Sequence, residues 1–110
     1  MGHLYYGNNT EPIDIPDSLL AHLKVVITTK LRRGESFTLA WRHEETMEPG
    51  RSAIWLQHSI PLRFVFESPE PETLRANALQ DFVNQANSSG GLTVDVRAWA
   101  DDEAGLVRVS

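Results

Sequence analysis

The sequence predicts an α+β fold with two layers, in which a mainly antiparallel sheet of five to six strands carries two helices on one face. Three observations lead to this prediction: a helical repeat of apolar residues in the first third of the chain, short segments in which apolar and polar residues alternate, and turn residues between these segments. The expected order is strand, strand, helix, three strands, helix, strand. Strands joined by short turns usually pair as hairpins, which favours one mainly antiparallel sheet.

Two short strands are expected at the start of the chain, at residues 3–7 and 12–15. Between them, Gly7, Asn8 and Asn9 tolerate a positive φ and therefore suit a turn. The sequence thus predicts that these two strands form a hairpin.

The first helix is expected to run from Pro16 to Arg33. Asp14 or Asp17 can cap its start, and Gly34 suits the position just past its end. Apolar residues recur at steps of three and four and form one stripe that should face a core. This stripe consists of Leu19, Leu20, Leu23, Val26, Ile27 and Leu31.

The densest basic cluster of the chain is Lys30, Arg32 and Arg33, in the last turn of this helix. Cations at that place meet the negative end of the helix dipole and the free carbonyl groups, which is worth about 0.3–1 kcal/mol each. We therefore interpret the cluster as a helix ending rather than as a phosphate-binding motif. Arg33 is expected on the outer face with His22 and Thr29, and it remains a candidate for contact with a partner.

Three alternating segments follow, at residues 36–42, 51–57 and 60–66. An acidic loop that ends in Pro-Gly separates the first two, and a tight turn at His58 and Ser59 separates the last two. With the helices on one face of the sheet, the opposite face should be open and apolar enough to need a cover. The residues expected on this open face are Thr38, Ala40, Arg42, Ala53, Trp55, Arg63 and Val65.

A second helix is expected after the Pro-rich break at 68–72, and a last strand at 92–96. Residues 1–97 are assigned to a single α+β domain. Residues 98–110 are assigned to an acidic C-terminal tail, which is either an edge strand or disordered. The second helix carries a narrower apolar stripe, formed by Leu79, Phe82, Val83 and Ala86.

Composition limits the class of protein. The chain has 110 residues, enough for one domain, and a net charge of -5, which argues against a general nucleic-acid binder. It contains no cysteine, which removes disulfides and thiolate metal sites. No signal peptide is recognisable, and no stretch approaches the about 20 apolar residues that span a bilayer. The sequence therefore predicts a soluble, cytoplasmic protein that does not associate with membranes.

The sequence offers no catalytic or metal-binding constellation. His3, His22, His43 and His58 lie on separate elements and lack the spacing of zinc-binding helices. The serines lack a Gly-x-Ser-x-Gly elbow, no glycine-rich phosphate loop is present, and the acidic pairs lie in segments that should be solvated. We expect no cofactor, no metal and no enzymatic activity.

The runs LLAHLKVVITTKLRRGESF and GRSAIWLQHSIPLRFVF resemble a family of short, uncharacterised proteins from actinobacteria. With the opening LYYG and the later NSSGGL, the resemblance extends to about Val96. Members of that family often carry the automatic label "ATP-dependent DNA ligase". Such ligases use a Lys-x-Asp-Gly motif, whereas Lys24 is followed by Val-Val-Ile and Lys30 by Leu-Arg-Arg. The residues therefore do not support ligase activity.

Two hypotheses about function follow. The first is a non-enzymatic interaction domain that forms homo-oligomers, most simply a homodimer, through the open sheet face around Trp55, although loops or the tail are an equal alternative as its cover. The second is a nucleic-acid-associated accessory protein, because exposed Arg and Trp also suit stacking and phosphate contacts. The candidate interaction surface consists of Arg33, Arg42, Trp55 and Arg63.

Overall fold

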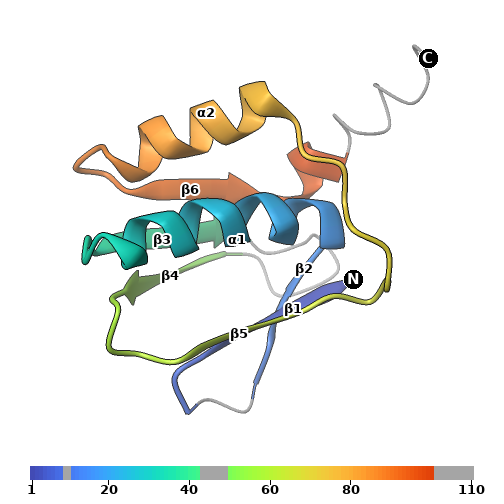
Figure 1. The fold of residues 1–110 in the computed structure, drawn as a ribbon, viewed down its shortest axis with the longest axis horizontal. Helices are drawn as coiled ribbons and strands as arrows, with labels where there is room; N and C mark the ends of the chain where they lie inside the picture. The colour runs from blue at the N-terminus through green and yellow to red at the C-terminus, as the bar shows by residue number, and fades with distance from the viewer. Residues whose placement is uncertain (9–10, 43–49, 101–110) are drawn as a thin grey trace.

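A computed structural model describes residues 1–8, 11–42 and 50–100 of the chain (Figure 1). It confirms the mixed α+β class, and the elements follow the predicted order with one addition, a helical turn at 96–100. The elements are β1 (Gly2–Tyr6), β2 (Ile13–Ile15), α1 (Asp17–Arg32), β3 (Phe37–Arg42), β4 (Arg51–Leu56), β5 (Leu62–Val65), α2 (Ala76–Ala86) and β6 (Leu92–Asp95).

The prediction of a single sheet is wrong, because the six strands form two three-stranded sheets. The N-terminal sheet has the order β2-β1-β5 and is antiparallel, and it includes the predicted hairpin of β1 and β2. The C-terminal sheet has the order β4-β3-β6, in which β3 pairs antiparallel with β4 and parallel with β6. The chain bends between β4 and β5, where the Pro61 carbonyl accepts a hydrogen bond from the Gly7 N–H at 2.9 Å. Beyond this bend, β5 pairs with β1 and not with β4.

The helices and the inner faces of both sheets share one apolar core. Figure 1 shows α1 and α2 alongside each other; α1 packs against α2 and β1, and α2 also contacts β3 and β6. The predicted stripe of α1 is confirmed: five of its six residues are buried and Leu31 is half-buried against them. The buried apolar residues are Leu4, Ile15, Leu19, Leu20, Leu23, Val26, Ile27, Phe37, Leu39, Leu56, Phe82, Ala86, Leu92, Val94, Val96 and Trp99.

His22 is completely buried, so its expected place on the outer face of α1 is wrong. Its Nδ1 atom donates a hydrogen bond to the Ser18 carbonyl at 2.7 Å, and its Nε2 atom accepts one from the Arg75 N–H at 2.9 Å. The rings of Trp99 and Phe82 meet the imidazole edge to face, with centroids at 4.7 and 6.5 Å. The segment that leads into α2 and the helical turn at 96–100 therefore cover a side of α1 that the sequence periodicity assigns to solvent.

Lys30 is also buried, with an exposed fraction of 7 %, although a residue that only ends a helix should be exposed. Its Nζ atom donates to Glu35 at 2.8 Å and to Asn87 at 2.7 Å. The helix nevertheless ends as predicted, because Gly34 has a φ of 73°. Lys30 thus ties the end of α1 to the start of β3 and to the end of α2.

Trp99 lies in the segment that the sequence analysis assigned to the tail, yet only 8 % of it is exposed and it belongs to the core. The helical turn that carries it follows β6 directly. The rest of the expected tail, residues 101–110, and the acidic loop at 43–49 lie outside the described residues.

Gly91 should be far less tolerant of substitution than its neighbour Gly90. Gly91 has a φ of 76°, and a Cβ atom there would lie 2.5 Å from the Thr38 carbonyl oxygen, whereas a Cβ at Gly90 would meet no atom within 4 Å. Gly91→Ala should lower the free energy of unfolding by more than about 1–2 kcal/mol, the cost of a left-handed conformation alone. Gly90→Ala should change it by less than about 0.5 kcal/mol. Urea denaturation of both variants measures the difference, and equal losses would contradict this account of the β3–β6 contact.

The Lys30–Glu35 ion pair should make stability depend on pH. The hydrogen bond and the positive charge of Lys30 lower the pKa of Glu35 below its usual value of 4.5. A lowered pKa contributes stability above the unfolded-state pKa, and this contribution is lost as the pH falls through the folded-state pKa. Glu35→Gln should therefore be less stable than the wild type at pH 7, and the gap should close as the pH falls below about 4.5.

The control for this titration is Glu70→Gln, which removes an exposed carboxylate in the segment before α2. Its stability should follow the wild type across the same pH range. If the difference in the free energy of unfolding between Glu35→Gln and the wild type stays constant as the pH falls, the negative charge of Glu35 is not what stabilises its contact with Lys30.

Candidate interaction surface

The C-terminal sheet has one face turned to the core and one turned away from it. Along β3 and β4, buried residues such as Leu39 and Leu56 alternate with exposed or half-buried ones. The strand register places these outward residues opposite one another. The open face, as we call it, consists of Thr38, Ala40 and Arg42 on β3, Arg51, Ala53 and Trp55 on β4, and Thr93 and Asp95 on β6.

Trp55 dominates the apolar end of the open face. Its exposed fraction is 55 %, more than that of any other large apolar side chain in the described part of the chain. It lies within β4 rather than in a loop, and its carbonyl oxygen accepts a hydrogen bond from the hydroxyl of Tyr6. The next outward pair along the strands, Ala40 and Ala53, places small side chains beside the ring. The result is a large aromatic ring presented to solvent from a well-supported strand.

The opposite end of the open face is positively charged. Arg42 and Arg51 face each other across β3 and β4, an arrangement that is unfavourable for like charges. Arg42 Nη1 lies 3.3 Å from Asp95 Oδ2 on β6, but the Arg42 side chain remains 70 % exposed. Among the described residues, Asp95 thus offsets part of the repulsion between the two guanidinium groups.

The structure brings together two of the four candidate residues, Arg42 and Trp55. The expectation that Arg63 shares their face is wrong, because β5 belongs to the N-terminal sheet, where the Arg63 guanidinium lies 5.5 Å from the centre of the Tyr5 ring. Arg33 lies beyond the end of α1, with Nη1 3.9 Å from a carboxylate oxygen of its neighbour Glu35.

Sequence reasoning did not place Arg51 or Asp95 on the open face, although Arg51 is among the arginines that the nucleic-acid hypothesis uses. The position of Arg51 could have been found, because it alternates with Ala53 and Trp55 along the expected strand at 51–57 and therefore points to the same side. The position of Asp95 could not, because it depends on the parallel pairing of β6 with β3, which joins segments far apart in the sequence.

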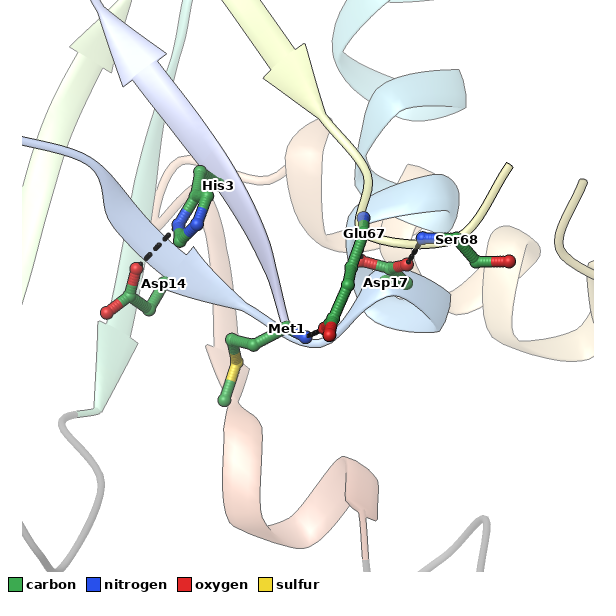
Figure 2. Close-up of polar contacts among 6 residues, drawn as sticks. All are labelled: Met1, His3, Asp14, Asp17, Glu67 and Ser68. Atoms are coloured by element: carbon green, nitrogen blue, oxygen red, sulfur yellow. Dashed lines mark hydrogen bonds and ion pairs between the residues drawn. The ribbon is translucent and has the colours of Figure 1, made fainter. Parts of the chain in front are cut away.

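A second polar cluster lies where the chain begins, where α1 begins and where β5 ends (Figure 2). The Asp17 carboxylate accepts hydrogen bonds from the backbone N–H groups of Glu67 and Ser68 at 3.1 and 2.9 Å. Burial raises the pKa of Asp17, but these two bonds, together with electrostatic attraction from the N-terminal amino group and His3, lower the pKa overall. The Met1 amino group pairs with the Glu67 carboxylate, a contact that raises the pKa of that amino group. Neither Asp14 nor Asp17 caps α1 with its side chain, so that expectation is wrong.

The three histidines in the described part of the chain, His3, His22 and His58, do not converge on a metal site. His3 pairs with Asp14 on the adjacent strand, with Nδ1 and Oδ1 2.7 Å apart (Figure 2), while His22 is buried in the core and His58 is exposed. Within residues 1–8, 11–42 and 50–100, no three acidic or histidine side chains gather in a way that could hold an ion. His43 lies outside the described residues.

Two clefts lie away from the open face's apolar end. A cleft of about 560 Å³ lies between α2, β6 and the helical turn, and there the Arg75 guanidinium stacks 4.2 Å from the centre of the Trp99 ring. A groove of about 350 Å³ lies between α1 and the segment at 66–74, with Val25 and Leu74 partly exposed along it. The described lining of neither contains a histidine or cysteine to serve as a base or a nucleophile.

The architecture and surface define a small α+β domain with two three-stranded sheets, one of which presents an open face with a Trp at one end and an Arg pair at the other. The chain belongs to the DUF7882 family, described as a domain of unknown function, whose model matches residues 1–97. No curated protein and no solved structure matches it. Across the described segments, no helix is both long and apolar enough to cross a membrane.

Proposed function

We propose that this domain is a non-enzymatic interaction module that associates with a second copy of itself through the open face. The observation that carries the proposal is the exposure of Trp55 in the body of a strand. Tryptophan and arginine are enriched in protein–protein interfaces, and a buried tryptophan is often the side chain that contributes most to the affinity. Burial of this ring against a partner removes a large apolar area from water.

The distribution of polarity over the open face supports the same proposal. Thr38, Ala40 and Ala53 surround the ring with small side chains, and the charged residues lie at the far end of the strands. Protein interfaces commonly have this arrangement, with charges depleted at the centre and tolerated at the rim. A second copy is the simplest partner, since dimers with two-fold symmetry are the commonest oligomers.

Ligase activity is no part of this proposal. Lys30 is buried and bonded to Glu35 and Asn87, so its amino group is not placed for attack on a nucleotide. The Lys24 ammonium lies 5.9 Å from the centre of the Phe66 ring, and no Lys-x-Asp-Gly motif surrounds it.

A nucleic-acid-associated accessory role is the second candidate, and the observation that favours it is the paired placement of Arg42 and Arg51 on the same face as Trp55. Bases could stack on the ring while phosphates meet the guanidinium groups. Asp95 beside Arg42 and a net charge of -5 weigh against it.

Truncation of Trp55 should break the self-association. The wild-type chain of 12.4 kDa should sediment as a dimer at high concentration, and Trp55→Ser should weaken the dimer by at least about 30-fold, the effect of losing an anchor worth about 2 kcal/mol. Leu74→Ser is the matched control, because Leu74 is also partly exposed but lies elsewhere. A wild-type chain that stays monomeric at high concentration would refute the proposal.

Single-stranded DNA and RNA of random sequence test the second candidate. If the Arg pair binds phosphates, the affinity should fall steeply between low and physiological salt, because each contact releases counterions. Arg42→Gln/Arg51→Gln should then flatten the salt dependence. An absence of binding at low salt removes the nucleic-acid role.

A further inference from the structure

We infer that the second copy docks about a two-fold axis that crosses the strands at the Ala40–Ala53 pair, so that Trp55 of each copy lies over the Arg42–Arg51 pair of the other. This inference rests on the proposed function, because it specifies the geometry of the same interface. It follows from where the residues of the open face lie along β3 and β4 and from the charges that they carry.

The open face is divided into two equal halves. Along β4 the outward residues are Arg51, Ala53 and Trp55, so the Arg and Trp positions are about 13 Å apart and Ala53 lies midway. Ala40 is the register partner of Ala53 on β3. The methyl groups of this central pair allow another sheet to approach to the usual distance of about 10 Å.

Two sheets can pack face to face about two different two-fold axes. An axis parallel to the strands places like ends together, so that the two copies would bring four guanidinium groups to one place around Arg42 and Arg51. An axis across the strands exchanges the ends, so that each Arg pair meets a Trp55 ring instead. Like charges held together in an interface are strongly unfavourable, and this repulsion favours the axis across the strands.

The exchanged arrangement also supplies a favourable contact. A guanidinium group stacks well on the face of an indole ring, and the attraction is larger when water is excluded. The described residues include guanidinium contacts with aromatic rings, Arg75 on Trp99 at 4.2 Å and Arg63 on Tyr5 at 5.5 Å.

The same arrangement gives a reason for the placement of Arg42 directly opposite Arg51. Within the described part of one copy this pair is unfavourable, and Asp95 on one side of Arg42 offsets part of the repulsion. The electron-rich face of a Trp55 ring from the other copy offsets more of it. The two halves of the open face are therefore complementary to each other, which is what a two-fold interface between identical chains requires.

Mixing two damaged variants tests the geometry. Trp55→Ser removes both rings from its homodimer, so it should dimerise at least about 30-fold more weakly than the wild type. Arg42→Gln/Arg51→Gln removes both Arg pairs and should dimerise at least about tenfold more weakly. A heterodimer of the two keeps one intact contact, the remaining ring on the remaining Arg pair. Native mass spectrometry, with one variant isotopically labelled, should show the heterodimer well above its statistical share.

A charge test gives a second, independent readout. Trp55→Glu should retain measurable dimerisation, because its carboxylate meets the Arg pair of the other copy, whereas Trp55→Lys should abolish it. If both variants lose dimerisation equally, or if the mixture shows only the statistical share of heterodimer, the exchanged geometry is wrong while the dimer itself stands. If the wild-type chain does not dimerise, the proposed function fails together with this inference.

Discussion

The whole structure depends on α1, which packs against α2 and β1 and lies in the one apolar core that both sheets share. Leu19, Leu20, Leu23 and Ile27 are completely buried, and so is the imidazole of His22 on another side of the same helix. A helix enclosed on so much of its circumference must satisfy every polar group that it buries. The hydrogen bonds of His22 and Lys30 therefore fix the position of whatever lies against α1, which includes the segment before α2 and the end of α2 itself.

The local elements and the β1–β2 hairpin were accessible from the sequence, whereas the division of the strands into two sheets was not. Spacings of three and four mark α1, and alternation marks β3 and β4, because both patterns depend only on neighbouring residues. Pairing of β5 with β1 depends on a bend near Pro61 and on a strand more than fifty residues earlier. The burial of His22 was missed for a related reason. An apolar stripe predicts that one side of a helix is covered, but it cannot show that a side with polar residues is covered as well.

The same distinction applies to the surface. Alternation along β3 and β4 correctly placed Arg42 and Trp55 on one outward face. Arg63 alternates just as regularly, yet it belongs to another sheet, so its pattern carried no information about its neighbours. Asp95 joins the surface only through a parallel pairing across the chain. Alternation in the sequence indicates the direction in which a side chain points, but it does not indicate which strands lie beside it.

The position of Trp99 affects where a fragment of this protein should end when it is prepared for expression. The family match ends at residue 97, but the ring of Trp99 packs on His22 and Phe82 and receives the guanidinium of Arg75. A fragment cut where the match ends would lose that ring, open a void beside a buried imidazole and expose the side of α1 that the helical turn protects. The unit that is recognised by sequence is thus shorter than the unit that packs, and expression boundaries are better chosen from the packing.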